Sequence, residues 1–174
     1  LEQRVRGVFG SGKTTVLAKR AVNAHLRHNE EVLILTYNIT VKNYIHDRIS
    51  DVRENFSWNN FHILNYHNFF NAMMNEVGIK IDKSLIEKEN LYEENDQDNG
   101  NDILDKAYYS NINLFENHID KLPKYKTILI DEVQDYKSEW IKIIRKYFTT
   151  ENSEMVLFGD EKQNIYERKL GDDR

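Results

Sequence analysis

The chain has 174 residues, and 40% of them are hydrophobic, which suffices for the buried core of one domain. The absence of cysteine excludes disulfide scaffolds and thiolate-metal sites and favours a reducing compartment, so we expect a cytoplasmic protein. No apolar run approaches the length of a membrane span, and no membrane association is expected. The net charge of −5 argues against a nucleic-acid binder, although residues 1–50 are net positive.

Short apolar runs alternate along the chain with stretches that have apolar residues at helical spacing. Buried strands are expected at residues 4–8, 31–36, 61–64, 126–131 and 155–160. Helices are expected at residues 13–28, 41–49, 68–77 and 138–148, the last with Ser138 as its N-cap. Repeated strand–helix units predict an α/β fold in which a parallel sheet carries helices on both faces.

The middle of the chain interrupts this alternation. Residues 79–122 are polar and irregular, with helical stretches expected near 83–92 and 102–121. The run "EKENLYEENDQDNGND" at residues 87–102 is typical of a solvated acidic loop. We therefore expect one domain over residues 1–174, with residues 79–122 as a small, mostly helical acidic insertion.

The stretch "GVFGSGKTT" at residues 7–15 fits the phosphate-binding pattern G-x-x-x-x-G-K-[ST] between a strand and a helix. Glycines let the backbone turn tightly and bring N–H groups to phosphate oxygens, and the following helix directs its positive end at the same anion. Lys13 can reach the β- and γ-phosphates, and the Thr14 hydroxyl can bind Mg²⁺. The alternative is a glycine turn before an ordinary helix. The predicted phosphate contacts are Gly7, Gly10, Ser11, Gly12, Lys13, Thr14 and Thr15.

The stretch "TILIDEVQDY" at residues 127–136 ends an apolar strand in two carboxylates. Asp131 at the carboxyl edge of the sheet can hold Mg²⁺, and Glu132 can polarise the water that attacks the γ-phosphate. This pair favours hydrolysis over transfer to a second substrate, which argues against a small-molecule kinase. A GTPase would need an N-K-x-D motif, and the sequence has none. The alternative interpretation is a strand end with solvated acidic residues.

A third apolar strand ends in "LFGDEKQNIY" at residues 157–166. Gln163 follows the strand, and its neutral amide can hydrogen-bond both a γ-phosphate oxygen and a nearby side chain. It would then sense whether the γ-phosphate is present. By itself this stretch fits a polar turn equally well, and its weight comes from its position after the other two motifs.

In this order, "GVFGSGKT", "DEVQD" and "GDEKQNIY" resemble the motifs of UvrD/Rep-type superfamily 1 helicases, in their first RecA-like domain. The resemblance implies that Lys13 and Thr14 serve ATP and Mg²⁺, that Asp131 holds the metal, that Glu132 is the base and that Gln163 senses the γ-phosphate. Gln134 and Asp135 would link the ATP site to neighbouring motifs. Two weaker stretches, "LTYNIT" and "NYHNFF", match family segments that face single-stranded nucleic acid, with Asn65 where the family has threonine. The residues implied there are Thr36, Tyr37, Asn38, Tyr66 and His67.

The resemblance implies an ATPase that moves along single-stranded nucleic acid, DNA in preference to RNA. A second RecA-like domain would supply arginines to the γ-phosphate, so we expect this chain to be part of a larger protein and to hydrolyse ATP slowly by itself. The alternative is a P-loop ATPase that acts as a nucleotide-dependent switch in a repair or defence complex without unwinding. Exposure of Tyr37, Tyr66 and His67 separates the two, because rings that pack in the core cannot stack on bases.

Overall fold

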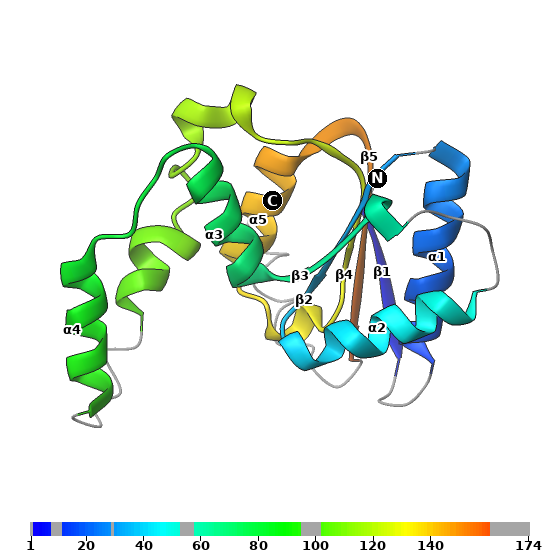
Figure 1. The fold of residues 1–174 in the computed structure, drawn as a ribbon, viewed down its shortest axis with the longest axis horizontal. Helices are drawn as coiled ribbons and strands as arrows, with labels where there is room; N and C mark the ends of the chain where they lie inside the picture. The colour runs from blue at the N-terminus through cyan, green and yellow to red at the C-terminus, as the bar shows by residue number, and fades with distance from the viewer. Residues whose placement is uncertain (1, 8–11, 29, 53–57, 95–101, 161–174) are drawn as a thin grey trace.

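The computed structural model describes residues 2–7, 12–28, 30–52, 58–94 and 102–160. Five strands form one parallel sheet in the order β1-β5-β4-β2-β3. The α/β fold predicted from the sequence is confirmed (Figure 1). The strands are β1 (Glu2–Gly7), β2 (Val32–Thr36), β3 (Phe61–Asn65), β4 (Tyr125–Ile130) and β5 (Thr149–Asp160).

The order of the strands decides which face each helix covers. From β1 to β3 the chain moves toward one edge of the sheet, and from β3 to β5 it moves back. Because crossovers between parallel strands are right-handed, the helices of the two halves lie on opposite faces. One face carries α1 (Lys13–His28) and α2 (Ile39–Asp51), and the other carries α3 (Tyr66–Glu76) and α5 (Ser138–Phe148) (Figure 1). Of the helices in the described part of the chain, none is both long and apolar enough to cross a membrane.

Strand residues point alternately into two hydrophobic clusters. Ile34 and Leu129 pack with the helices on the α1 and α2 face, whereas Leu33 and Ile128 pack with α3 and α5. All five residues of β2 are buried, as the continuous apolar run predicted. Burial on both faces fixes the register, because a shift of one residue would exchange the two sets of side chains.

The starts of α3 and α5 differ in detail from the prediction. α3 begins at Tyr66, two residues early, because the side chain of Asn65 caps it by accepting from the Asn68 N–H over 2.8 Å. Ser138 was expected to cap α5, but it is the first helical residue, and Lys137 occupies the cap position without a side-chain cap bond. A cation there is disfavoured by the helix dipole, so Lys137 needs compensating negative charge nearby.

The last strand also begins earlier than the predicted residue 155. β5 starts at Thr149, but its pairing with β4 is irregular, because Tyr125 pairs with Thr149 while Thr127 pairs with Glu154. The hydroxyl of Ser153 donates to the carbonyl of Tyr125 over 2.7 Å and stabilises this irregular section. The added residues lie at the amino edge of the sheet, away from the predicted site.

The segment between α3 and β4 is only partly helical. α4 (Lys83–Glu94) forms as expected and lies beyond α3, at the far end of the molecule from α1 (Figure 1). The helical stretch expected near 102–121 forms as two short elements: η2 (Asp105–Tyr109) is one π-helical turn, and η3 (Glu116–Lys121) is a 3-10 helix. The side chain of Asn111 bonds to the carbonyl of Ala107 and to the N–H of Asn113, which competes with helix continuation.

The same segment contributes to the core. Phe115 is fully buried and packs against Phe70 of α3 and Phe148 of α5, with ring centroids 5.0 and 6.0 Å away. Tyr66 donates its hydroxyl to the carbonyl of Tyr109 over 2.8 Å. Residues 102–122 are therefore joined to the sheet domain by packing and by hydrogen bonds.

Replacement of Phe115 tests this packing. Phe115→Ala should lower the free energy of unfolding by about 3–5 kcal/mol, because it leaves a cavity among aromatic rings. Ile119→Ala, 36% exposed in the same segment, should cost less than about 1 kcal/mol. Urea denaturation followed by circular dichroism measures both, and equally small losses would mean that the segment does not pack on the core.

Candidate nucleotide site

The carboxyl ends of the strands meet at one edge of the sheet, where parallel α/β sheets bind ligands. Gly7 at the end of β1 pairs with Asp160 at the end of β5, and Leu35 of β2 pairs with Ile130 of β4. The N–H of Asp131 continues this pairing by donating to the carbonyl of Leu35 over 2.8 Å. The phosphate loop, the carboxylate pair and the segment after β2 therefore begin at the same edge.

The structure describes both ends of the phosphate loop. Gly12 has a φ of 84°, a left-handed conformation that favours glycine. The Nζ of Lys13 donates to the carbonyl of Gly7 over 2.6 Å, so the ammonium group joins the two ends of the loop beside the start of α1. The N-terminus of that helix favours an anion. Of the other predicted phosphate contacts, Thr14 and Thr15 lie in the first turn of α1, and Gly10 and Ser11 fall outside the described residues.

Asp131 is a buried carboxylate, with 6% of its surface exposed. Burial raises its pKa, while the N–H of Glu132 and the positive charge of Lys13 act in the opposite direction. The influence of Lys13 places this carboxylate near the phosphate loop. A cation bound beside Asp131 would offset the cost of burying its negative charge.

Glu132 adopts a left-handed conformation, with a φ of 53°, the only non-glycine residue in the described part of the chain with positive φ. Such a conformation is costly for a residue with a side chain and is often found at functional sites. The Glu132 N–H donates to Oδ1 of Asp131 over 2.9 Å. Burial raises the pKa of Glu132, Asp131 and Asp135 raise it further, and a hydrogen bond from the backbone N–H of Asn38 opposes them. The turn thus directs the Glu132 carboxylate to the segment after β2.

The turn that follows packs tightly on the last strand. A methyl group added at Gly159 would lie 2.8 Å from Cγ1 of Val133 and 3.2 Å from Oε1 of Gln134. Only glycine leaves room for η4 (Val133–Asp135) at this distance. Gln134, expected to link neighbouring motifs, therefore contacts the strand that leads to Gln163. Gln163 itself lies outside the described residues.

The oxygen donors near Lys13 fit Mg²⁺. This ion usually takes one or two protein ligands together with phosphate oxygens and waters. Asp131 offers a buried carboxylate, and Thr14 offers a hydroxyl in the helix turn that begins at Lys13. In the described residues, no group of three or more His, Cys, Asp or Glu side chains is arranged to hold a metal ion. The described donors therefore suit an ion that binds together with the nucleotide.

The residues predicted to face nucleic acid divide into exposed and buried ones. Tyr37 is 45% exposed and stacks on Trp140 of α5, with ring centroids 6.4 Å apart and planes at 19°. Tyr66 is 1% exposed and stacks on Trp140 at 4.6 Å and 11°, so its ring is part of the core and cannot meet a base in this structure. Thr36 is also fully buried, and its hydroxyl donates to the carbonyl of Asn38 over 3.2 Å.

Asn38 and His67 lie between these extremes. Asn38 is exposed, but its backbone N–H is bonded to the Glu132 carboxylate. His67 is half-buried with its ring edge-on to Tyr109 and Trp140, and burial lowers its pKa. Tyr37 therefore offers the exposed aromatic surface in this set, and His67 offers part of a ring.

Trp140 and Tyr136 are central to this arrangement, and neither was singled out from the sequence. Tyr136 donates its hydroxyl to the carbonyl of Thr36 over 2.7 Å and packs edge-on against Trp140. The spacing of four residues between two large aromatics, directly after the carboxylate pair, is the signal that could have indicated them. The sequence predicted only that Trp140 lies in the helix at residues 138–148.

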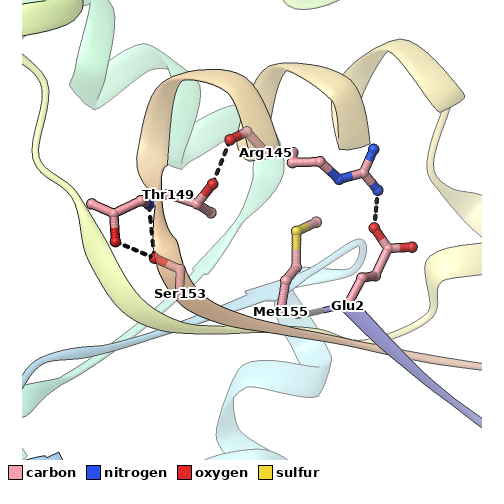
Figure 2. A pocket seen from close by; sticks show the side chains of 6 residues that line it. Glu2, Arg145, Thr149, Ser153 and Met155 are labelled. Carbon is pink, nitrogen blue, oxygen red and sulfur yellow. Dashed lines mark hydrogen bonds and ion pairs between the residues drawn. The ribbon is translucent and has the colours of Figure 1, made fainter.

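A cavity of about 140 Å³ lies at the opposite edge of the sheet (Figure 2). Arg145 spans it and donates to the carboxylate of Glu2, the first residue of β1. The phosphate loop follows the other end of that strand, roughly 20 Å away at ~3.3 Å per residue. The cavity is therefore separate from the candidate nucleotide site. Its lining residues are Glu2, Arg145, Thr149, Thr150, Ser153 and Met155.

Comparison with known protein families agrees with this geometry. The family model of an AAA domain matches residues 4–169, which is nearly the whole chain and includes both the phosphate loop and the carboxylate pair. No protein of curated function matches the chain. The chain therefore belongs to the AAA-domain family of P-loop NTPases.

Proposed function

We propose that this AAA domain hydrolyses ATP and couples hydrolysis to movement along single-stranded nucleic acid, DNA in preference to RNA, as the first RecA-like domain of a UvrD/Rep-type superfamily 1 helicase. The family match supports a nucleotide-binding ATPase. The helicase role is the finer proposal. It rests on how the carboxylate pair is joined to an exposed aromatic residue.

In this proposal each group has one task. The ammonium group of Lys13, which bonds to the carbonyl of Gly7 in this structure, would bind the β- and γ-phosphates. Thr14 and Asp131 would hold Mg²⁺, which would neutralise charge on the transferred phosphoryl group. Glu132 would orient and deprotonate the attacking water, since burial and Asp131 raise its pKa. A second RecA-like domain would supply the arginine that completes the site.

The observation that carries the proposal is the contact between the turn of Glu132 and the segment after β2: the Tyr136 hydroxyl donates to the carbonyl of Thr36 over 2.7 Å, and the backbone N–H of Asn38 acts on the Glu132 carboxylate and lowers its pKa. The residue proposed as the base is bound to the backbone next to Tyr37, whose ring is exposed. A change at the γ-phosphate that moves Glu132 would therefore act directly on the segment that carries this ring. A pure nucleotide-binding domain would not require that connection.

The nucleotide-dependent switch in a repair or defence complex is a second candidate. It is favoured by the burial of Tyr66 and Thr36, which leaves fewer groups to contact nucleic acid than the resemblance implies. In that case Tyr37 would contact a partner protein, and oligonucleotides would neither bind at Tyr37 nor change the affinity for ATP.

The phosphate loop can be tested by calorimetry with ATP and Mg²⁺. Lys13→Ala removes the cation expected to contact two phosphates, so the Kd for ATP should rise roughly tenfold or more. Lys19→Ala, an exposed lysine on the same helix, is the control and should bind ATP like the unmodified chain. Equal affinity in all three proteins would refute the phosphate-binding role.

Two substitutions of Glu132 separate its role as the base from its link to the backbone of Asn38. Glu132→Gln keeps an oxygen that can accept from the Asn38 N–H but cannot take a proton, whereas Glu132→Ala loses both. Phosphate release should fall by roughly 10²–10⁴-fold in either variant. Because slow turnover is expected, it is measured over many hours with the protein in excess over ATP. Oligothymidylate should still change the Kd for ATP in Glu132→Gln but not in Glu132→Ala. Loss of the effect in both variants would show that the Asn38 bond does not carry it.

The exposed ring of Tyr37 can be tested against a matched control, Tyr44. Tyr37→Ala should weaken binding of fluorescent oligothymidylate by roughly 5–150-fold, which corresponds to the loss of one stacked base. Tyr44→Ala removes a tyrosine of α2 with similar exposure, 48%, that lies against the guanidinium of Arg48, and should leave binding unchanged. Fluorescence anisotropy measures both, and equal losses would point to non-specific contacts.

A further inference from the structure

Asp105, in the acidic middle of the chain, is at the centre of a polar cluster on α5. Its Oδ1 accepts from Nε1 of Trp140 over 3.0 Å, and its Oδ2 accepts from Nζ of Lys137 over 2.8 Å and from the hydroxyl of Ser110 over 2.7 Å. Nε1 of Trp140 also lies 3.1 Å from the hydroxyl of Ser110. One carboxylate from the predicted insertion at residues 79–122 thus holds two residues in and beside the first turn of a core helix.

The negative charge of Asp105 compensates an unfavourable positive charge at the start of α5. Lys137 occupies the N-cap, where the helix dipole disfavours a cation. Asp105 and Asp102 accept from its ammonium group at 2.8 and 3.1 Å. Burial opposes the charge of Asp105, but hydrogen bonds from Lys137, Ser110 and Trp140 outweigh it and lower its pKa. The carboxylate is therefore ionised and strongly bound at neutral pH.

The indole held by Asp105 is the middle ring of a stack. Trp140 stacks with both buried Tyr66 and exposed Tyr37, with interplanar angles of 11° and 19°. The N–H bond to Asp105 fixes rotation of the indole in its own plane, and the two tyrosines fix its faces. If the indole turned, Tyr37 would lose the surface that supports it.

We propose that Asp105 is a positioning residue for the Tyr37 surface: it holds Trp140 in the plane on which Tyr37 stacks, and so prepares the exposed ring to receive a base of single-stranded nucleic acid. This inference rests on the proposed function for its ligand. It assigns to the acidic segment a task in binding that its composition does not suggest.

A structural anchor alone would predict a different outcome. If Asp105 only joined its segment to the core, its loss would lower stability but leave Trp140 and Tyr37 stacked in the folded protein. If it positions the stack, its loss changes the surroundings of Trp140 and the affinity for oligonucleotide under conditions where the protein is fully folded. A spectroscopic measurement on Trp140 separates the two.

The test uses the whole chain with Trp58→Phe, so that Trp140 is the one remaining tryptophan. Asp105→Ala removes the acceptor, and Asp105→Asn keeps an oxygen for the indole N–H while losing the charge. Asp120→Ala, an exposed acid of the same segment, is the control. For each protein, the fluorescence of Trp140, its change on adding Tyr37→Ala, and the Kd values for oligothymidylate and for ATP with Mg²⁺ are measured below the unfolding transition.

Asp105→Ala should shift the emission of Trp140, remove its sensitivity to Tyr37→Ala and weaken oligothymidylate binding roughly fivefold, the lower end of one base stack, with the Kd for ATP unchanged. Asp105→Asn should give the same Trp140 emission as the Trp58→Phe protein, and its Kd for oligothymidylate should lie within about twofold of that protein's. Unchanged emission and affinity in folded Asp105→Ala would overturn the inference. If the Trp58→Phe protein binds ATP but no oligothymidylate, the helicase proposal fails, and the inference is overturned with it, because no base then reaches Tyr37.

Discussion

The pairing of β4 with both β5 and β2 is the constraint on which the site depends. β4 is buried on both faces, and the N–H of Asp131 continues its pairing to β2 by one residue. That extra bond fixes where the strand stops and the carboxylate begins. Because the sheet is parallel, the same edge receives the end of β1 and therefore the phosphate loop. A register shift of one residue in β4 would move Asp131 away from Lys13. It would also exchange the side chains on the two buried faces of β4.

Burial works against negative charge at the carboxylate edge of the sheet. Asp131 and Glu132 are adjacent acids whose pKa values are raised by burial, and Lys13 is the cation whose charge reaches Asp131. The ammonium group of Lys13 donates to the backbone carbonyl of Gly7, and the backbone N–H of Asn38 acts on the Glu132 carboxylate. A nucleotide with its metal would offer each a charged partner instead. Binding should therefore rearrange the segments on which these side chains now rest, including residues 36–38.

The sequence predicted the elements whose pattern is local, and failed where the deciding partner is distant. Lys13, Asp131 and the strands before them followed from glycine spacing and apolar runs, because the start of a helix and the end of a buried strand are set by neighbouring residues. The burial of Tyr66 did not follow, since a tyrosine after a strand can face either the core or solvent, and its partner Trp140 is far along the chain. Asp105 was overlooked for the same reason: it follows the acidic run in a polar insertion, and its hydrogen-bond partners Lys137 and Trp140 lie beyond β4.

The burial of Tyr66 also changes what the aromatic residues can do. The resemblance implied Tyr37, Tyr66 and His67 for nucleic acid, but the structure stacks both tyrosines on Trp140, with Tyr66 as the inner ring and Tyr37 as the outer one. An inner ring fixed by a hydrogen bond to Tyr109 cannot move outward without breaking core contacts. It can, however, give the outer ring a rigid support, and a supported ring loses less conformational entropy on binding than a free one. In the proposed helicase, Tyr66 and Tyr37 would act on the same base, one through packing and the other through contact, and Asp105 would hold the indole on which both stack.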